Sequence, residues 1–290
     1  MTSSSSDKIF FVEKNRNENS ILNIICNSLF PFFSTIDILP CRLVCKEFND
    51  AISNYPWNDI YTVVLGNIEM WRRCFPKAKA ININELNPSQ GSRRRHVRDN
   101  DIRFLQGIKY INISKCHFIT DNCFEYLSGV KCILMNYCYT ITGDGFRHLT
   151  GIKRLECSYN SRINDSHMIF LKGIKYLNII ECPSITDDSF IHFSTLVEVN
   201  IASNRHLTDK AFNYLKNVQA INISNNFQDK ITPEIFTNLN SKKIKYLIMD
   251  NCSDLLISSA VNYGYKTFTN WAEQHKEYKS LPTLISLKIY

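Results

Sequence analysis

Side chains that could do chemistry recur in this chain with a period of 22 residues. They are of two kinds: cysteine can hold zinc or act as a nucleophile, and paired carboxylates can serve as general acid and base. The recurring cysteines are Cys116, Cys138, Cys182 and Cys252. The recurring carboxylates are Asp121, Asp165, Asp187 and Asp209.

The pattern favours structural roles for both kinds of side chain. Asparagine stands at the cysteine position in other repeats, as Asn160, Asn204 and Asn226, and it cannot replace a thiolate in a metal site or a disulfide. Both side chains can hydrogen-bond the backbone of a tight turn. The aspartates end an Ile-Thr-Asp pattern ahead of an apolar pair, which predicts short helices capped by the Thr or the Asp.

No other motif predicts an enzyme or a cofactor site. The sequence contains no Cys-x-x-Cys pair, phosphate-binding loop, His-Glu-x-x-His helix or nucleophile elbow. A basic cluster could bind phosphate or direct nuclear import, although a charged loop is the simpler interpretation. It consists of Arg93, Arg94, Arg95, His96 and Arg98. We expect a protein that is not an enzyme and that uses no cofactor and no metal.

Composition and charge are those of an ordinary soluble globular protein. Apolar residues make up 44% of the 290 residues and charged residues 21%, and the net charge is +7. No apolar run reaches the ~18 residues of a membrane span. Residues 1–7 are polar, so we expect no secretory signal and reduced cysteines. We expect neither nucleic acid nor a membrane as a partner.

The 22-residue period runs from residue 107 to residue 238 and predicts a solenoid. Each repeat opens with alternating apolar and polar residues, the pattern of a short strand with one buried face. The expected buried positions are Ile108, Ile111, Ile113; Val130, Ile133, Met135; Ile152, Leu155, Cys157; Ile174, Leu177, Ile179; Leu196, Val199, Ile201; and Val218, Ile221, Ile223. Three further strands are expected at Ala78, Ile81, Ile83; at Ile244, Leu247, Met249; and at Leu284, Leu287, Ile289. Nine strands at ~4.8 Å spacing give a stack roughly 40 Å long.

The second half of each repeat predicts a short helix on the outer side of the curved stack. Its apolar pairs are Phe124/Leu127, Phe146/Leu149, Met168/Leu171, Phe190/Phe193, Phe212/Leu215 and Phe236/Leu239. The polar strand positions should face the concave side, where Tyr and Arg are suited to anchoring an interface. The candidate contact residues are Tyr110, Tyr137, Arg154, Tyr159, Tyr176, Glu181 and Tyr246. A further column, expected to be a solvated edge, consists of Lys109, Lys131, Lys153 and Lys175.

Residues before about position 77 do not follow the repeat. The apolar stripe of a first helix is Ile21, Leu22, Ile25 and Leu29. Ser34 or Thr35 can cap a second helix, inside which Pro40 would tighten or break a turn. A third helix is expected to carry Phe48, Ala51 and Ile52. Three short helices cannot bury this apolar surface alone, so either a partner protein or the end of the solenoid must cover it.

This leading segment resembles the F-box. The most specific part of the match is Arg42-Leu43-Val44-Cys45-Lys46, followed by Phe48 and Trp57. The segments Leu29-Phe30, Phe33-Ser34 and Asp37-Ile38 also match, whereas Ile21-Leu22 and Ile24 depart from the usual Leu-Pro and Glu. The repeats, with the pattern L-x-x-L-x-L-x-x-C/N-x-x-I-T-D, resemble cysteine-containing leucine-rich repeats.

The two resemblances together imply an α/β leucine-rich-repeat solenoid preceded by a small all-α F-box. We expect a disordered tail at 1–18, an F-box at 19–60, a linker helix at 61–76 and the solenoid at 77–290. This layout implies the substrate-recognition subunit of an SCF-type E3 ubiquitin ligase. Its F-box would bind the adaptor, and through it a cullin, and its repeats would bind a target protein. The alternative is an interaction scaffold or decoy that binds the adaptor without target ubiquitylation.

The adaptor-facing positions implied by the resemblance are Leu22, Ile25, Leu29, Phe30, Ile38, Leu39, Leu43 and Val44. Some of them must instead hold the three helices together, and the sequence does not separate the two sets. Trp57 is expected to join the F-box to the linker, and the stretch 253–282 is a second candidate for target contacts. The layout resembles proteins of amoebae and of giant viruses that infect them. We therefore expect the cytoplasm or nucleus of a eukaryotic cell, a host cell if the protein is viral.

Overall fold

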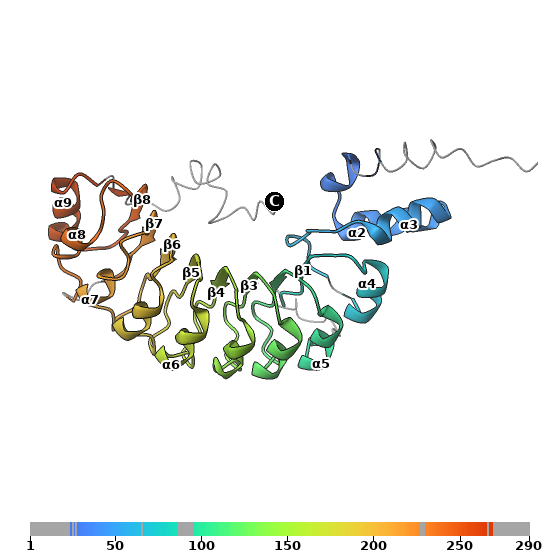
Figure 1. The fold of residues 1–290 in the computed structure, drawn as a ribbon, viewed down its shortest axis with the longest axis horizontal. Coiled ribbons are helices and arrows are strands. Elements are labelled where there is room, and N and C mark those ends of the chain that lie inside the picture. The colour runs from blue at the N-terminus through green and yellow to red at the C-terminus, as the bar shows by residue number, and fades with distance from the viewer. Residues whose placement is uncertain are drawn as a thin grey trace, which may run out of the picture.

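The computed structural model describes residues 24, 26, 28–64, 66–85, 96–226, 230–265 and 267–268. In these ranges the repeats form one sheet of nine parallel strands in sequence order. The strands are β1 (Ala80–Asn82), β2 (Tyr110–Asn112), β3 (Cys132–Leu134), β4 (Arg154–Glu156), β5 (Tyr176–Asn178), β6 (Glu198–Asn200), β7 (Ala220–Asn222), β8 (Tyr246–Ile248) and β9 (Thr267–Phe268). They line the inner side of an arc, with helical turns on the outer side and a helical head at one end (Figure 1). This is the α/β architecture of a leucine-rich-repeat solenoid.

Consecutive strands pair without a shift in register. Ile111 aligns with Ile133 and Ile133 aligns with Leu155, and the same alignment continues to Leu247. The middle residue of every strand from β1 to β8 is buried, as the alternating pattern predicts. Burying one such side chain contributes about 1.5–3 kcal/mol, but a single repeat has no second surface to bury it against. The stack therefore forms cooperatively.

A strand that the sequence did not predict follows β8. It is β9, which pairs with β8 at Thr267–Phe268, whereas the strand expected at 284–289 lies outside the described residues. The intervening helix α9 (Asp254–Asn262) is followed by Gly264, whose φ of +81° lets the chain turn back toward the sheet. The stretch after residue 253 is therefore in part a further repeat. It lacks the alternating apolar triplet by which the other strands were identified.

The outer side of the arc consists of short helical turns. The α-helices are α5 (Asp99–Ile102), α6 (Asp165–Met168), α7 (Asp209–Phe212) and α8 (Ile235–Asn238). The 3-10 turns are η3 (Arg103–Leu105), η4 (Asp121–Leu127), η5 (Asp144–His148), η6 (Ile169–Leu171) and η7 (Asp187–His192). The apolar pairs expected in these turns are all buried, from Phe124 to Leu239. A 22-residue unit that also holds a strand and two connections leaves room for little more than one such turn.

Of the two residues predicted as helix caps, Thr and Asp, the aspartates instead bond the following repeat. The caps are the preceding residues, such as Thr186, whose hydroxyl accepts from the backbone of its own turn. Asp165 instead accepts from Thr186 N at 2.8 Å and from Thr186 Oγ1 at 2.7 Å. The same pair of hydrogen bonds joins Asp99 to Thr120, Asp121 to Thr142, Asp187 to Thr208 and Asp209 to Thr232. These carboxylates form a ladder that links neighbouring repeats.

The column of Cys and Asn forms a second ladder, as predicted. Cys138 Sγ donates to Ile113 O at 3.1 Å, and Asn160 Nδ2 donates to Met135 O at 2.9 Å. Cys116, Cys182, Asn204 and Cys252 bond the preceding repeat in the same way. Burial raises the pKa of Cys138 to about 12, so its thiol stays protonated and can donate. All eleven cysteines are free thiols.

The head is built from short helices with one proline-induced break. Its elements are η1 (Phe30–Phe32), α2 (Thr35–Ile38), η2 (Leu39–Leu43), α3 (Lys46–Asn54) and α4 (Ile68–Cys74). Ser34 caps α2, and its Oγ accepts from Asp37 N at 3.1 Å. Pro40 falls where α2 would continue, and the chain tightens there into the 3-10 turn η2.

Trp57 contacts the linker at Phe75, as we expected, with ring centroids 5.8 Å apart, and it also joins the head to the first strand. Its side chain is buried, its ring stacks on Phe30 with centroids 5.2 Å apart, and its Nε1 donates to Ile52 O. Its carbonyl oxygen accepts from Lys79 N at 2.7 Å and from Ala80 N at 3.1 Å. One residue thus belongs both to the head's core and to the hydrogen bonds that start the sheet.

Candidate functional site

The head exposes a run of large apolar side chains between positions 29 and 44. We call this set the head patch: Leu29, Phe32, Phe33, Ile36, Leu39, Leu43 and Val44. Leu43 is 90% exposed and Phe32 is 85% exposed. Folded soluble domains rarely leave so many large apolar groups in water, and such a patch marks a contact surface. Four of the predicted adaptor-facing residues belong to it, and Leu22 and Ile25 lie outside the described residues.

Two of the predicted contact residues, Phe30 and Ile38, are buried inside the head instead. Each is only 2% exposed. The Phe30 ring contacts the rings of Phe48 at 6.1 Å and Tyr55 at 5.1 Å, edge to face in both cases. Their assignment to the adaptor surface is therefore wrong, because a partner cannot reach them without opening the core. The structure separates the two sets that helical spacing alone left mixed.

Leu43 and Val44 are exposed because the residues on either side of them are anchored. Arg42 Nε donates to Asn49 Oδ1 on α3 at 2.8 Å, which holds the end of η2 against α3. Cys45 caps α3, and its Sγ accepts from Phe48 N at 3.4 Å. The two apolar residues between these anchors project outward.

The sequence did not single out Phe32, Phe33 and Ile36 as contact residues, although they belong to the head patch. Each follows or precedes a residue that the core takes up, such as Phe30 or Thr35. The signal that could have identified them is an apolar side chain at a helix position turned away from the buried face. That signal was weak here because these helices are only three to five residues long.

On the solenoid, Tyr137 and Tyr159 form a stacked pair. Their ring centroids lie 4.3 Å apart with planes 8° from parallel. Lys115 Nζ lies 5.8 Å from the Tyr137 ring on the preceding repeat. Partial burial and the hydrogen bond with Tyr159 raise the pKa of Tyr137, so this hydroxyl stays protonated. The pair offers two rigid aromatic rings at the edge of the sheet, the kind of surface that anchors a protein interface.

These rings sit on backbone that is costly for non-glycine residues. Tyr137 has a φ of +61°, Tyr159 +62° and Glu181 +52°, all in the left-handed region. Lys115, Ser203, Asn225 and Asn251 occupy the same position of other repeats with the same backbone. Asn tolerates this region, whereas Tyr and Glu do not favour it. The turn that leads out of each strand imposes this conformation.

Arg154 lies on the concave face within a charged cluster. Its Nη2 is 2.6 Å from Glu156 Oε1 on the same strand, and its Cζ is 5.8 Å from the Tyr176 ring on the next. Burial lowers the pKa of the Arg154 guanidinium, but Glu156, Cys132 and Glu198 together raise it more, so the pKa is raised overall. Glu198, which is buried, adds a second carboxylate nearby. The cluster can offer paired charges to a partner.

The predicted contact residues do not converge on one point. Tyr137 pairs with Tyr159 and Arg154 pairs with Tyr176, and Glu181 is exposed in the next repeat beyond Tyr159. Tyr110 lies on β2 and Tyr246 on β8, with five strands between them. Such spacing suits an extended interface along the arc and does not suit a single catalytic pocket.

We expected the lysine column to be a solvated edge, but three of its lysines also make hydrogen bonds to the next repeat. Lys109 Nζ donates to Gly129 O at 3.1 Å, and Lys131 Nζ donates to Gly151 O at 3.3 Å. Lys153 makes the same bond to Gly173 O at 3.3 Å. Each ammonium thereby ties its repeat to the glycine turn of the next.

The described part of the chain shows neither a cluster of metal ligands nor a membrane-spanning helix. Among the described residues, no three His, Cys, Asp or Glu side chains gather as they would around a metal ion. Of the basic cluster, His96 contacts Glu85 at 3.1 Å and Arg98 lies over the Phe118 ring at 5.2 Å, while residues 93–95 lie outside the described ranges. None of the helices in those ranges has both the length and the apolar character to cross a membrane.

Comparison with known proteins gives distant structural likenesses. No protein-family model and no curated protein matches this chain. A chain of the Rad7–Elc1 complex of yeast is 9% identical, with 89% of this chain and 94% of that chain covered and a TM-score of 0.45. A chain of the TLR13–ssRNA13 complex is 20% identical, with 64% and 26% covered and a TM-score of 0.46. A chain of the Toll–Spatzle complex of Drosophila is 14% identical, with 71% and 31% covered and a TM-score of 0.45. At TM-scores below 0.5 these likenesses carry no partner or activity over to this chain.

Proposed function

We propose that this protein is a non-catalytic substrate-recognition subunit of an SCF-type E3 ubiquitin ligase. In this proposal the head is an F-box that binds the adaptor, and through it a cullin, and the solenoid binds a target protein. The protein would act by proximity, holding a lysine of the target near a conjugating enzyme bound elsewhere in the complex. It would work in the cytosol or nucleus of a eukaryotic cell.

The head patch is the observation that carries this proposal. Leu43 and Val44 lie in the run Arg42-Leu43-Val44-Cys45-Lys46 that most resembles the F-box, and they are 90% and 72% exposed. A monomer that leaves such side chains in water exposes apolar surface that a partner would bury. The alternative, that the end of the solenoid covers the head, does not account for this exposure. The solenoid contacts the head through Trp57, on the buried side of its core.

Binding to the purified adaptor tests the proposal directly. We expect a complex by size-exclusion chromatography, and we expect Leu43→Asp/Val44→Asp to abolish it because two buried charges would replace two apolar contacts. The control is Phe170→Asp/Ile191→Asp, which adds the same charges at exposed apolar positions on the outer side of the solenoid. Loss of binding in the first variant but not in the control supports the proposal. A folded wild-type protein that binds no adaptor and no cullin would exclude it.

A ubiquitylation assay separates a receptor from a decoy. The variant Leu43→Asp/Val44→Asp should still bind targets through its solenoid. Proteins that copurify with this variant are therefore candidates for modification by the reconstituted ligase. Multi-site ubiquitin transfer to one of them, dependent on wild-type head residues, would identify a receptor. Adaptor binding with no transfer to any recovered protein would identify a scaffold or decoy.

A further inference from the structure

The lysine column continues backward to Lys79 at the start of the sheet. Lys109 N donates to Lys79 O at 2.8 Å, and Lys131 N donates to Lys109 O at 2.8 Å. In the same way Lys153 bonds Lys131 at 2.9 Å, and Lys175 bonds Lys153 at 3.0 Å. These five lysines, which we call the lysine row, stand immediately before the strands β1 to β5. They therefore lie side by side along one edge of the sheet, with neighbouring strands ~4.8 Å apart.

No carboxylate accompanies the lysine row. The turns that carry four of its members cover residues 105–109, 127–131, 149–153 and 171–175, and they contain neither Asp nor Glu. The repeat aspartates lie at the opposite end of each helical turn, as Asp121 does at the start of η4. Within the described ranges, none of the five ammonium groups forms an ion pair. Like charges on neighbouring strands destabilise a sheet, and a partner that supplies negative charge would relieve that repulsion.

Three ammonium groups of the row are already held in position. Lys109, Lys131 and Lys153 donate to glycine carbonyl oxygens of the next repeat at 3.1, 3.3 and 3.3 Å. An ammonium group carries three protons, so each of these keeps two for a ligand. A lysine side chain loses rotamer freedom when it binds a partner, and part of that entropy is already lost in the folded protein. The row is thus preorganised as a line of hydrogen-bond donors.

We propose that the lysine row binds one face of an acidic α-helix from another protein. Carboxylates placed alternately three and four residues apart share one face of a helix, and at 1.5 Å per residue their mean spacing is about 5.3 Å. Over the length of the row such a helix departs from the lysines by about 2 Å, which a lysine side chain can span. An extended peptide with an acid at every second residue advances about 6.7 Å per acid and departs by about 8 Å. The spacing therefore favours a helix.

Two other anionic partners fit the lysine row less well. Sites for single-stranded nucleic acid combine basic side chains with aromatic rings on which bases stack, and the four turns free of carboxylates contain no aromatic side chain either. Membrane-surface sites insert apolar side chains beside their lysines. The apolar residues of these turns, such as Ile108 and Val130, are buried. That the acidic helix belongs to a ligase target rests on the proposed function, whereas the binding itself does not.

The probe is a fluorescein-labelled helical peptide of about 18 residues, built on Ala and Gln, with five glutamates on one face. It is titrated with full-length protein in fluorescence anisotropy, beside a peptide of the same composition whose glutamates are spread around the helix. We expect the aligned peptide to bind at least about tenfold more tightly, because each exposed ion pair contributes up to about fivefold. Lys153→Gln/Lys175→Gln should remove most of that preference, and Lys153→Arg/Lys175→Arg should retain it. Both lysines are exposed, so these changes leave the fold intact.

Lys46→Gln/Lys210→Gln is the matched control, because both lysines are exposed, lie away from the row and give the same change in net charge. We expect it to bind like the wild type. Equal affinities for the two peptides would overturn the proposal, as would an equal loss in the control variant. Tighter binding to single-stranded DNA or to phosphatidylserine vesicles than to the aligned peptide would assign the row to that ligand instead. The head variant Leu43→Asp/Val44→Asp should bind the peptide normally, so a failure here is distinguishable from a failure of adaptor binding.

Discussion

At the scale of single residues, Gly143 combines a left-handed backbone with a close neighbour. Its φ is +106°, and a Cβ added there would lie 2.6 Å from the His167 ring. That ring cannot move aside without loss, because His167 Nδ1 accepts from Asn164 N at 3.2 Å and Nε2 contacts Asp144 at 3.3 Å. We expect Gly143→Ala to lower the free energy of unfolding by about 2–3 kcal/mol in urea denaturation followed by circular dichroism.

Gly107→Ala is the control for that measurement. Gly107 has a similar left-handed backbone, with a φ of +82°, but a Cβ there would meet nothing within 4 Å. It should lose about 1–2 kcal/mol, the backbone cost alone. Equal losses in the two variants would mean that His167 yields its place freely.

Asp121 makes part of the stability depend on pH. Burial raises the pKa of this carboxyl, but hydrogen bonds from Thr142, Gly143 and Gly145 lower it more, so the pKa lies below its ordinary value. A carboxylate whose folded-state pKa is lowered stabilises the protein above the unfolded pKa of ~3.9 and loses that contribution as the pH falls through the folded value. We expect Asp121→Asn to cost about 1–3 kcal/mol at neutral pH, and the difference from wild type to shrink below pH ~4.

The matched control for Asp121 is Asp188→Asn, an exposed carboxylate in the first turn of η7. Among the described residues its side chain bonds no neighbouring repeat. Its stability curve should follow the wild type at every pH in the same urea titration. A parallel shift of both variants would point to net charge rather than to the ladder.

At the scale of elements, each turn ladder can be tested at one rung. Asn204 Nδ2 donates to Ile179 O at 2.8 Å and its Oδ1 accepts from Cys182 N at 2.8 Å. Asn204→Ala leaves both of these buried groups unpaired and should cost about 2–5 kcal/mol. Asn204→Cys restores the donor, as Cys138 and Cys182 do in their own repeats, and should recover part of the loss in thermal unfolding. Identical losses would show that the side chain fills space rather than bonding the turn.

The repeat elements were predictable because many positions recur together. Eight of nine strands follow from alternating triplets such as Ile108, Ile111 and Ile113, and the triplet side chains are buried as expected except Ile244, which is half-buried. The period also indicated the Cys and Asn ladder. It could not show that Asp165 reaches the next repeat, because a helix cap and an inter-repeat bond require the same residue at the same place.

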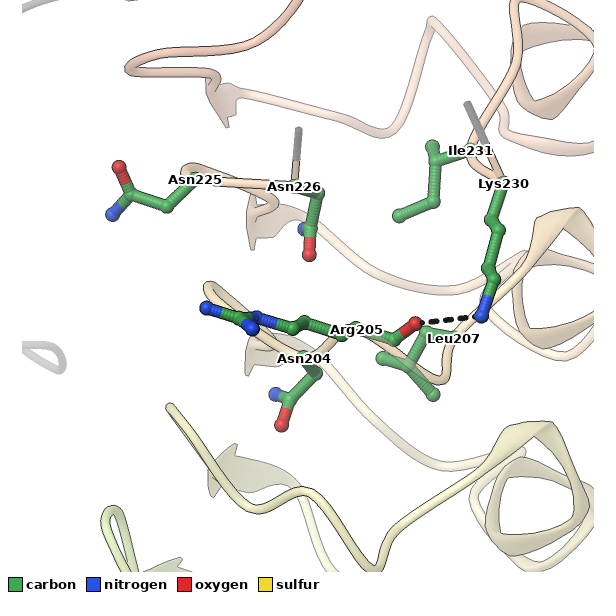
Figure 2. A pocket seen from close by; sticks show the side chains of 7 residues that line it. All are labelled: Asn204, Arg205, Leu207, Asn225, Asn226, Lys230 and Ile231. Carbon is green, nitrogen blue, oxygen red and sulfur yellow. Dashed lines mark hydrogen bonds between the residues drawn. The ribbon is translucent and has the colours of Figure 1, made fainter. Parts of the chain in front are cut away.

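Side-chain exposure in the head and the cavity beside Ile231 could not be predicted from the sequence, for physical reasons. Helical spacing shows that Phe30 and Leu43 are apolar, but which of them faces the core depends on the 3-10 turns around Pro40. The cavity lined by Leu207 and Ile231 lies between two neighbouring turns (Figure 2), so no pattern within one turn predicts it. In both cases the decisive contact joins segments that no local pattern relates.

At the scale of the whole molecule, equal repeats should be removable as units. Deleting residues 174–195 removes one 22-residue repeat, brings Asp165 next to Thr208 and so preserves the ladder register. We expect a folded protein with a single, weaker cooperative transition by circular dichroism in urea, since each repeat contacts only its neighbours. Deleting 185–195 removes half a repeat and should abolish that transition. A half-repeat deletion as stable as the full one would argue against the register.

The junction at Trp57 has a mechanical consequence. Because Trp57 packs into the head and also accepts hydrogen bonds from Lys79 and Ala80, the solenoid is connected rigidly to the head. The in-register strands then continue the sheet in a fixed direction, with neighbouring strands ~4.8 Å apart. Under the proposed function, a target protein bound at a given repeat would stay at a fixed distance from the adaptor bound to the head. The position of a lysine on the surface of the target, and not the sequence around it, would then determine whether that lysine is ubiquitylated.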